Sequence, residues 1–214
     1  MAERSAADRR ADLVTLYREL SDWRCPLAAT RTKLVFGNGN ANADLMFVGE
    51  APGAEEDRQG IPFVGRAGRL LDQLLGEIGL ERGDVWVSNV LKCRPPGNRD
   101  PLPEEIAECE PHLMRQIELI EPKVICTLGN FSTKLLSGSP LGITKVHGRP
   151  KPRRVGALDV QLYPLFHPAA ALRTPATLDL LREDFAGLQG LLARGRRPAQ
   201  EAPGVEASQL DLFA

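Results

Sequence analysis

The chain has 214 residues and a formal net charge of −1 at pH 7, with 43% hydrophobic and 26% charged residues. These proportions are those of an ordinary globular protein, and at this length the chain can bury a full hydrophobic core. They exclude a strongly basic nucleic-acid coat protein, and no apolar run approaches the roughly 18 residues of a membrane span.

Apolar residues at helical spacing predict helices along the chain, and short apolar runs between turn-forming residues predict strands. In chain order the predicted elements are a helix over 7–21, a strand over 32–36, a strand over 44–48, a helix over 66–79, a strand over 85–90, a helical region that starts at Pro103 and is interrupted at Pro111, a strand over 124–128, a short helix over 130–137, a strand over 160–166 and a helix over 177–193.

The alternation of short, wholly apolar strands with helices predicts an α/β fold. We expect a three-layer α/β/α sandwich around a central, mainly parallel sheet of four strands. Residues 1–193 form a single domain in this interpretation. Residues 194–214, rich in Pro, Ala, Gly and charge, form a disordered tail.

Three polar segments follow predicted core strands, at 49–65, 89–99 and 167–173. In open α/β sheets ligands bind beyond the carboxyl ends of the strands, so these segments are expected to converge on an active site. Taken alone, each has a plainer interpretation. The acidic loop could be a solvated surface, Phe63 a core side chain, Asn89 a turn residue and His167 a structural histidine.

Two further segments are locally basic. Residues 145–154 carry five cations and no acid, among them Lys145 and Arg149, and residues 92–99 carry Lys92 and two arginines. Such segments bind phosphate through charge and counterion release, or they are simply solvated loops.

Three long motifs together resemble the family-4 uracil-DNA glycosylases, the iron–sulfur branch of the uracil-DNA glycosylase superfamily. They are GEAPGAEEDRQGIPFVGRAGRLL, VSNVLKCRPPGNRDPLPEE and LFHPAAALR, and the resemblance covers about residues 20–190. It implies a monofunctional hydrolase that flips uracil out of single- or double-stranded DNA and cleaves its N-glycosidic bond, initiating base-excision repair of deaminated cytosine.

The resemblance also implies roles for individual residues. Phe63 matches the position that stacks on uracil, Asn89 the one that reads the base edge, and His167 the donor toward uracil O2. Family-1 enzymes place a catalytic aspartate where this chain has Ala51, so the backbone of Ala51 and Gly53 is expected to hold uracil O2 or the attacking water.

Two carboxylates remain as candidates for stabilising the cationic sugar or orienting water. They are Glu50 and Glu56, and Glu56 is also placed to exclude the methyl group of thymine. Lys145, Arg149 and Arg173 are expected to contact DNA. A related branch traps uracil covalently through a KRRIH-type insertion, which is absent here, so no stable adduct is expected.

The N-terminus MAERSAADRRADL has no apolar signal segment, so the four cysteines are expected in the cytoplasm, where metal sites are commoner than disulfides. By resemblance, Cys25, Cys93 and Cys109 are ligands of a [4Fe–4S] cluster, and the position of the fourth cysteine is taken by Asp22. An oxygen ligand on one iron is chemically possible.

Two alternatives for this centre stay open. One iron could lack a protein ligand, or the site could hold zinc with His112 added to the cysteines. The remaining cysteine, Cys126, is expected to be a small buried core residue.

The last residues, SQLDLFA, resemble the QLxLF peptide that binds the bacterial sliding clamp. Gln209, Leu210, Leu212 and Phe213 would then anchor the tail in a groove of that partner. We expect a monomer in the bacterial cytoplasm, associated with the nucleoid.

Two other functions compete with the glycosylase. One is a catalytically silent module of the same fold that binds uracil-containing or other DNA. The other is a redox-sensing iron–sulfur protein, for which the aspartate in place of the fourth cysteine is the hint.

Overall fold

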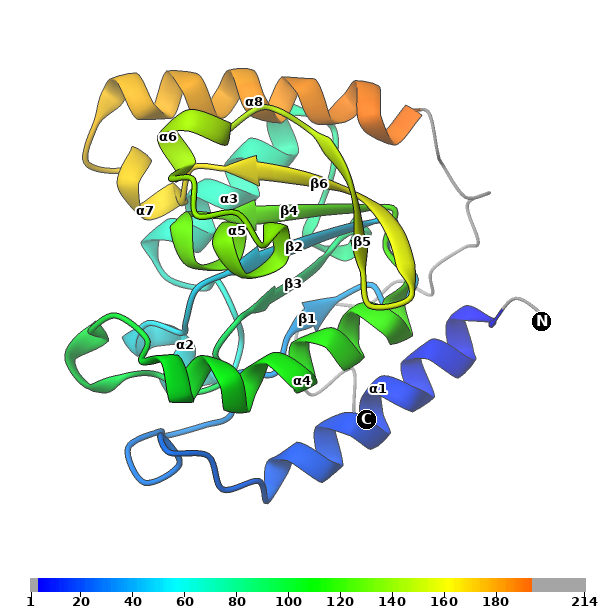
Figure 1. Ribbon diagram of the computed structural model, residues 1–214, viewed down its shortest axis with the longest axis vertical. Coiled ribbons are helices and arrows are strands. Elements are labelled where there is room, and N and C mark those ends of the chain that lie inside the picture. The colour runs from blue at the N-terminus through cyan, green and yellow to red at the C-terminus, as the bar shows by residue number, and fades with distance from the viewer. Residues whose placement is uncertain (1–3, 194–214) are drawn as a thin grey trace.

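The computed structural model describes residues 4–193 and contains a six-stranded sheet between layers of helices (Figure 1). The elements are α1 (Ala6–Ser21), β1 (Asn38–Gly39), β2 (Leu45–Gly49), α2 (Ala54–Gln59), α3 (Arg66–Glu77), η1 (Arg82–Asp84), β3 (Trp86–Asn89), η2 (Pro96–Asn98), α4 (Pro103–Ile120), β4 (Val124–Leu128), α5 (Asn130–Ser137), α6 (Ile143–Val146), β5 (Lys151–Val155), β6 (Leu158–Leu165), α7 (Pro168–Ala171) and α8 (Pro175–Ala193).

The strand order is β1-β3-β2-β4-β6-β5. The four central strands run parallel, as predicted, and an antiparallel strand is added at each edge. The prediction of a four-stranded sheet is therefore wrong in strand number. The two missing strands have no apolar signal, because β1 has only two residues and the first four residues of β5 are exposed.

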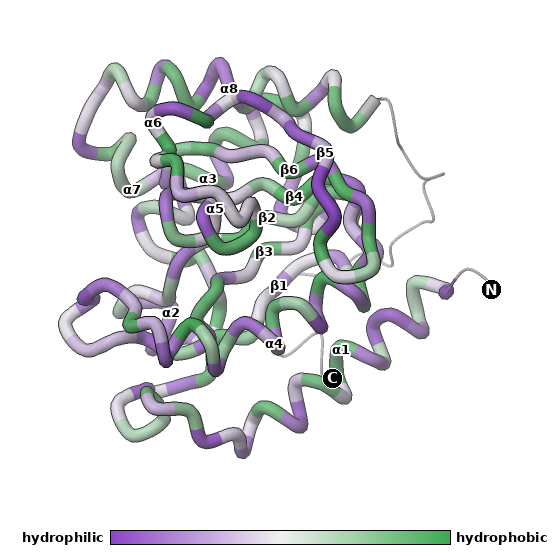
Figure 2. The backbone as a smooth tube through the Cα atoms, in the orientation of Figure 1, coloured by the Kyte–Doolittle hydropathy of each residue, from purple (hydrophilic) through white to green (hydrophobic). Residues whose placement is uncertain are grey.

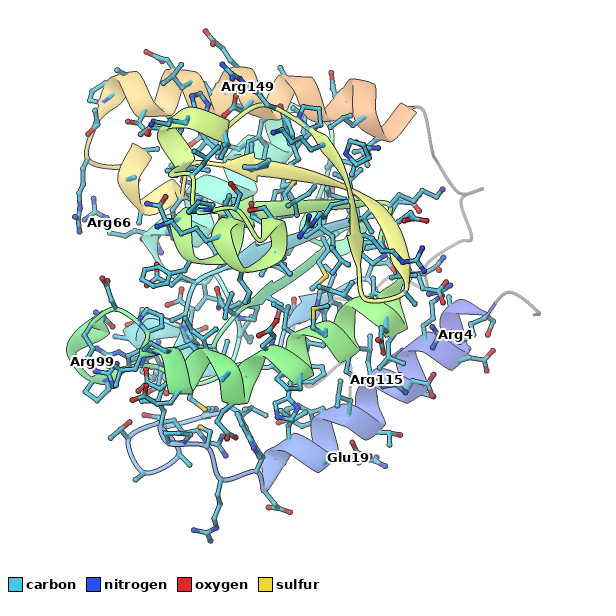
Figure 3. The ribbon with its side chains drawn as sticks, in the orientation of Figure 1. Arg4, Glu19, Arg66, Arg99, Arg115 and Arg149 are labelled. Carbon is cyan, nitrogen blue, oxygen red and sulfur yellow. The ribbon has the colours of Figure 1, made fainter. Side chains whose placement is uncertain are left out.

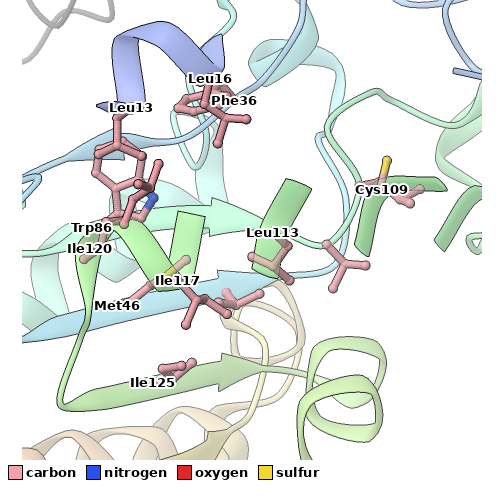
Figure 4. Packing of buried hydrophobic residues seen from close by; sticks show 14 of the residues in the cluster. Leu13, Leu16, Phe36, Met46, Trp86, Cys109, Leu113, Ile117, Ile120 and Ile125 are labelled. Carbon is pink, nitrogen blue, oxygen red and sulfur yellow. The ribbon is translucent and has the colours of Figure 1, made fainter. Parts of the chain in front are cut away.

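Successive residues of the central strands point into two different cores. Met46 and Val48 of β2 pack on one face of the sheet, while Leu45 and Phe47 pack on the other. The first face is covered by α1 and α4, which contact each other, and the second by α3, α7 and α8 (Figures 1 and 4). This arrangement confirms the α/β fold with helices on both sides of the sheet.

Three local predictions are wrong. Residues 32–36 are irregular, with Thr32 and Lys33 exposed and the next three residues buried. The backbone N–H of Val35 donates to the carbonyl of Lys92, and that of Thr32 donates to Asp57 Oδ1. Pro111 lies inside α4 without ending it, because Cys109, Leu113 and Ile117 bury one side of that helix against the core. The loop predicted over 49–65 contains the short helix α2, which ends at Gly60 in the left-handed conformation.

Hydropathy follows this architecture (Figure 2). The central strands are mainly apolar, whereas β5 at the edge is hydrophilic. Among the helices within residues 4–193, none is both long and apolar enough to cross a membrane. The predicted tail over 194–214 lies outside the described residues.

Candidate active site

The carboxyl ends of β2 and β3 meet in register. Gly49 is paired with Asn89, and the backbone continues this pairing for two more residues, with Val90 N–H donating to the carbonyl of Gly49 and Leu91 N–H to that of Glu50. Parallel strands thus bring the first two predicted polar segments together, as the topological argument requires.

A cavity of about 490 Å³ opens at these strand ends. Its wall contains all the predicted catalytic and base-binding residues together with Arg173. The lining residues are Glu50, Ala51, Pro52, Gly53, Glu56, Phe63, Ala67, Asn89, Pro95, Asn98, Arg99, Asp100, His167, Ala169 and Arg173. Figure 3 shows Arg99, which lines the cavity, and Arg66 at the end of the molecule where the arrows of β4 and β6 end.

Asn89 is the most confined polar residue of the cavity wall. Its side chain is 1% exposed, and within the described chain its Oδ1 has no hydrogen-bond partner. A buried acceptor without a donor lowers the stability of the folded protein, so this oxygen is expected to accept a hydrogen bond from an N–H group of a ligand. Gly49 makes room for it, because a Cβ there would collide with Asn89 Oδ1 and lie 2.6 Å from Phe63 Cζ.

Two rings form another part of the wall. The rings of Phe63 and His167 lie 5.6 Å apart between centroids and 27° from parallel. Phe63 is 5% exposed, so its ring is seated in the wall rather than in solvent. A flat apolar face of this kind suits a planar heterocycle.

The protonation of His167 is fixed by its position as the N-cap of α7. Its Nδ1 accepts a hydrogen bond of 3.1 Å from the backbone N–H of Ala169, which leaves the proton of the neutral ring on Nε2. Burial lowers the pKa of His167 to about 4, and the charge of Glu56 only partly opposes this. At neutral pH the residue is therefore an uncharged N–H donor.

The carboxylates of the cavity differ in their surroundings. Glu56 Oε1 accepts hydrogen bonds from the backbone N–H groups of Val64 and Gly65, at 3.0 and 2.8 Å. Burial, with a contribution from the charge of Asp100, raises the pKa of Glu50. Asp100 itself was missed by the sequence reasoning, although it directly follows the cations of the second motif.

Lys92 is not the phosphate ligand that the sequence suggested, because its side chain is fully buried. Its Nζ donates to the carbonyl of Asn89 at 2.8 Å and to Ser88 Oγ and Gln116 Oε1, both at 2.7 Å. Burial lowers the pKa of Lys92 to about 7. This lysine supports the backbone beneath the cavity instead of facing DNA.

The basic segment over residues 145–154 is largely exposed. Lys145 in α6 and Arg149 in the following loop are exposed. Between them His147 Nδ1 lies 2.9 Å from Asp184 Oδ2, and its ring packs 4.4 Å from that of Phe166, the neighbour of His167. The basic segment is therefore tied to the strand end that carries His167.

Three of the four cysteines belong to the core on the face of the sheet that α1 and α4 cover. Cys25 follows α1, Cys93 follows β3 and Cys109 lies in α4, and Cys25 Sγ is 3.2 Å from Cys93 Sγ. Arg31 Nη1 donates to Cys93 Sγ at 3.3 Å. Contact with Cys93 lowers the pKa of the Cys25 thiol. We call these three cysteines the thiol corner.

Soft sulfur donors from three separate segments fit a thiolate-bound centre. As placed, however, no three His, Cys, Asp or Glu side chains within residues 4–193 are close enough together to hold a metal ion. Asp22 is exposed at the end of α1, and His112 packs its ring against Trp23 at 4.5 Å. Cys126 is fully buried on the opposite face of the sheet, which confirms it as a core residue.

Comparison with known proteins supports this architecture. The profile of the Uracil DNA glycosylase superfamily matches residues 36–189. The chain is 47% identical to a type-4 uracil-DNA glycosylase of Sulfurisphaera tokodaii over 81% of each chain. It is 49% identical to one of Thermotoga maritima over 70% of this chain and 77% of that protein. A type-5 enzyme of Pyrobaculum aerophilum shares 32% identity over 61% of this chain.

Proposed function

Because this chain belongs to the uracil DNA glycosylase superfamily, on its type-4 branch, we propose that it excises uracil from DNA by hydrolysis of the N-glycosidic bond. The carrying observation is the buried Oδ1 of Asn89, a residue of the cavity wall, which has no donor among the residues that the structure describes. A base buried in a duplex cannot reach this atom, so the nucleotide must be flipped out. Removal of uracil begins base-excision repair of deaminated cytosine.

Recognition of uracil follows from the donor and acceptor pattern of its edge. Asn89 Oδ1 accepts from uracil N3–H, and the amide N–H₂ donates to uracil O4. Cytosine presents an acceptor at N3 and a donor at C4, so it would leave the buried oxygen unpaired. A site of this kind rejects such an analogue strongly.

Stacking and shape complete the recognition. The seated ring of Phe63 provides the face on which the base stacks. Glu56 lines the cavity, and its carboxylate accepts hydrogen bonds from the backbone N–H groups of Val64 and Gly65. We assign Glu56 the exclusion of the thymine methyl group.

The chemical step requires stabilisation of the departing uracil anion. His167, neutral and protonated on Nε2, donates to uracil O2 as negative charge develops there. A preorganised donor of this type contributes about 3–4 kcal/mol to the transition state. The opposing positive charge on the sugar is balanced by a carboxylate, for which Glu50 is the candidate, with Asp100 beside it.

The attacking water has no aspartate at position 51 to activate it. We propose that the backbone of Ala51 and Gly53 and the carboxylate of Glu50 position the water, since all three line the cavity. Because glycosidic hydrolysis passes through an oxocarbenium-like transition state, groups that orient the water toward the sugar contribute to the reaction.

DNA is held by charge around the cavity mouth. Arg173 lines the cavity, and Lys145 and Arg149 are exposed on the segment tied to Phe166. We propose that these three cations contact phosphates of single- or double-stranded DNA.

We also propose that the thiol corner holds a [4Fe–4S] cluster through Cys25, Cys93 and Cys109, with Asp22 as the fourth ligand. Such a cluster would hold the segment after α1, the loop after β3 and α4 together, so its contribution is structural. Zinc, with His112 as an added ligand, is the alternative. A brown protein that absorbs near 400 nm and contains iron supports the cluster, whereas a colourless protein with stoichiometric zinc contradicts it.

Several wider features are part of the same proposal. Residues 1–193 form one monomeric domain, and residues 194–214 form a tail whose Gln209, Leu210, Leu212 and Phe213 bind a sliding clamp. We place the protein at the nucleoid in the bacterial cytoplasm. Deletion of 209–214 should abolish retention on immobilised clamp and leave activity on short oligonucleotides unchanged.

The decisive experiment is alkaline cleavage of labelled oligonucleotides after incubation with the protein. We expect cleavage at uracil in single strands, U:G and U:A, none at T:G, and no SDS-resistant adduct. If the protein binds uracil-DNA without producing abasic sites, it is a catalytically silent DNA-binding module. If it does neither and only its cluster changes oxidation state reversibly, it is a redox sensor.

A further inference from the structure

The backbone of Phe63 is in a conformation that its side chain disfavours. Its φ is +55°, in the left-handed region. Asn98, which also lines the cavity, has the same φ, but Asn tolerates this region whereas a bulky aromatic residue does not. Such strain costs about 1–3 kcal/mol and persists only where neighbouring groups enforce it.

The group that enforces it is an arginine outside the cavity wall. Arg82 Nη2, from η1, donates to the carbonyl of Pro62 at 2.7 Å and to that of Phe63 at 2.8 Å. The side chain of Arg82 is only 15% exposed, and its Nη1 lies 3.6 Å from Asp72 Oδ1. One guanidinium thus fixes the two consecutive carbonyls that flank the strained residue.

The following peptide groups are held from the opposite side. Glu56 accepts from Val64 and Gly65, and Gly68 lets α3 approach the carbonyl of Phe63 closely, because a Cβ there would collide with that oxygen. The backbone around Phe63 is therefore fixed on both sides. Of the two side chains that bond to this backbone, Glu56 lines the cavity and Arg82 does not, so the role of Arg82 can be separated from direct contact with the base.

We propose that Arg82 is a positioning residue for excision, which acts through the carbonyls of Pro62 and Phe63 to keep the Phe63 ring in its stacking position. The proposal rests on the proposed function of the cavity. Without Arg82, two buried carbonyls lose their donor and Phe63 relaxes to negative φ, which moves its ring out of the wall.

The test begins with single variants assayed on single-stranded uracil oligonucleotide, well below each unfolding midpoint. Arg82→Gln should lower kcat/KM about 100-fold, the size expected when a binding surface is displaced by about an ångström. Arg82→Lys retains a charge but not the fork that reaches both carbonyls, so it should recover about tenfold of that loss. Arg182→Gln is the matched control, since Arg182 bridges α8 to Glu77 at the surface, and its activity should stay within about twofold of wild type.

A double-mutant cycle with Phe63→Ala distinguishes positioning from general stabilisation. If Arg82 acts through the Phe63 ring, Arg82→Gln should cost less than about threefold in the Phe63→Ala background. Multiplicative losses, or wild-type activity in Arg82→Gln, overturn the proposal. If Arg82→Gln does not fold, the same cycle is measured with Arg82→Lys and read by the same criterion.

The wild-type assay separates the two levels of the argument. A wild-type protein that leaves uracil in DNA overturns the proposed function and the role of Arg82 with it. An active wild type with multiplicative losses overturns only the role of Arg82.

Discussion

Two regions only four residues apart in sequence are built on opposite principles. At Asn89 the cavity wall is fixed by the chain's own bonds, from Arg82 and Glu56 to the Phe63 segment and from Ala169 to His167. At Cys93 the thiol corner has a contact between two sulfur atoms and a hydrogen bond from Arg31, and backbone groups at Leu27 and Lys92 bond to the thiols of Cys25 and Cys109.

The difference indicates how each region obtains its order. The cavity is preorganised by protein groups, and within residues 4–193 Asn89 Oδ1 has no donor and stays open for the base. The thiol corner joins three segments through sulfur atoms, which form only weak hydrogen bonds, so we expect its rigidity to depend on a bound inorganic group. Variants in the first region should therefore change activity, and variants in the second should change stability.

The largest effect is expected from Asn89→Ala. Excision of uracil should fall about 1,000-fold, because the group that pairs with uracil N3–H and O4 is lost. The unfolding midpoint should not fall, since the removed Oδ1 has no partner in the described part of the chain and its burial is costly. Oligonucleotide cleavage and a thermal melt measure the two effects, and a large fall in the melting temperature would break the comparison.

The opposite profile is expected from Cys109→Ala. The variant should lose its bound iron and about 2–4 kcal/mol of stability, the range of a core truncation with loss of a tied segment. Excision measured well below the unfolding midpoint should remain. Cys126→Ala is the control, because it removes an equally buried thiol from the other core and should keep the metal. Metal analysis measures the iron content and thermal melts measure the stability of the two variants. Equal iron content in both variants would contradict the assignment of Cys109 as a cluster ligand.

A pH dependence of intermediate size is expected from His167. Its pKa is about 4 in the folded protein against an ordinary 6.5, so below about pH 6.5 the unfolded chain takes up a proton that the folded protein does not. Stability contributed by this residue is therefore lost as the pH falls from 6.5 toward 4. In His167→Gln the melting temperature should fall less over this range, and ring resonances of wild-type His167 should not titrate between about pH 6 and 8.

The smallest effect is expected from Leu172→Ala. Leu172 is 40% exposed and precedes Arg173 of the cavity wall, a place where an apolar side chain can fill the gap left by a flipped base. Excision from duplex DNA should fall about five- to tenfold and excision from single strands should not change. Equal losses on both substrates would show that Leu172 supports the cavity itself.

Much of the fold is predictable because burial leaves a pattern in the sequence. The strands around Met46, Val87 and Ile125 are apolar on both faces and were located to within a residue or two. The edge strands were missed since pairing by backbone bonds alone leaves no side-chain pattern. Pro111 was misread because burial of one side of α4 against the core outweighs the loss of one helical hydrogen bond.

The cavity residues that lie in the three sequence motifs were predictable. The residues whose position depends on tertiary contacts were not. Asn89, Phe63 and His167 meet as expected. The burial of Lys92 and the reach of Arg82 over 19 residues to Phe63 depend on how strands and loops stack, which no local sequence pattern encodes.

The outer edge of the sheet has a consequence for behaviour in concentrated solution. Strand β5 exposes Lys151, Arg153 and Arg154 and contains Pro152, so a second copy aligned along this edge would meet like charges and a missing N–H group. Open strand edges are where folded proteins recruit one another into aggregates, and cations and proline there oppose it. We therefore expect the folded protein to resist edge-to-edge aggregation.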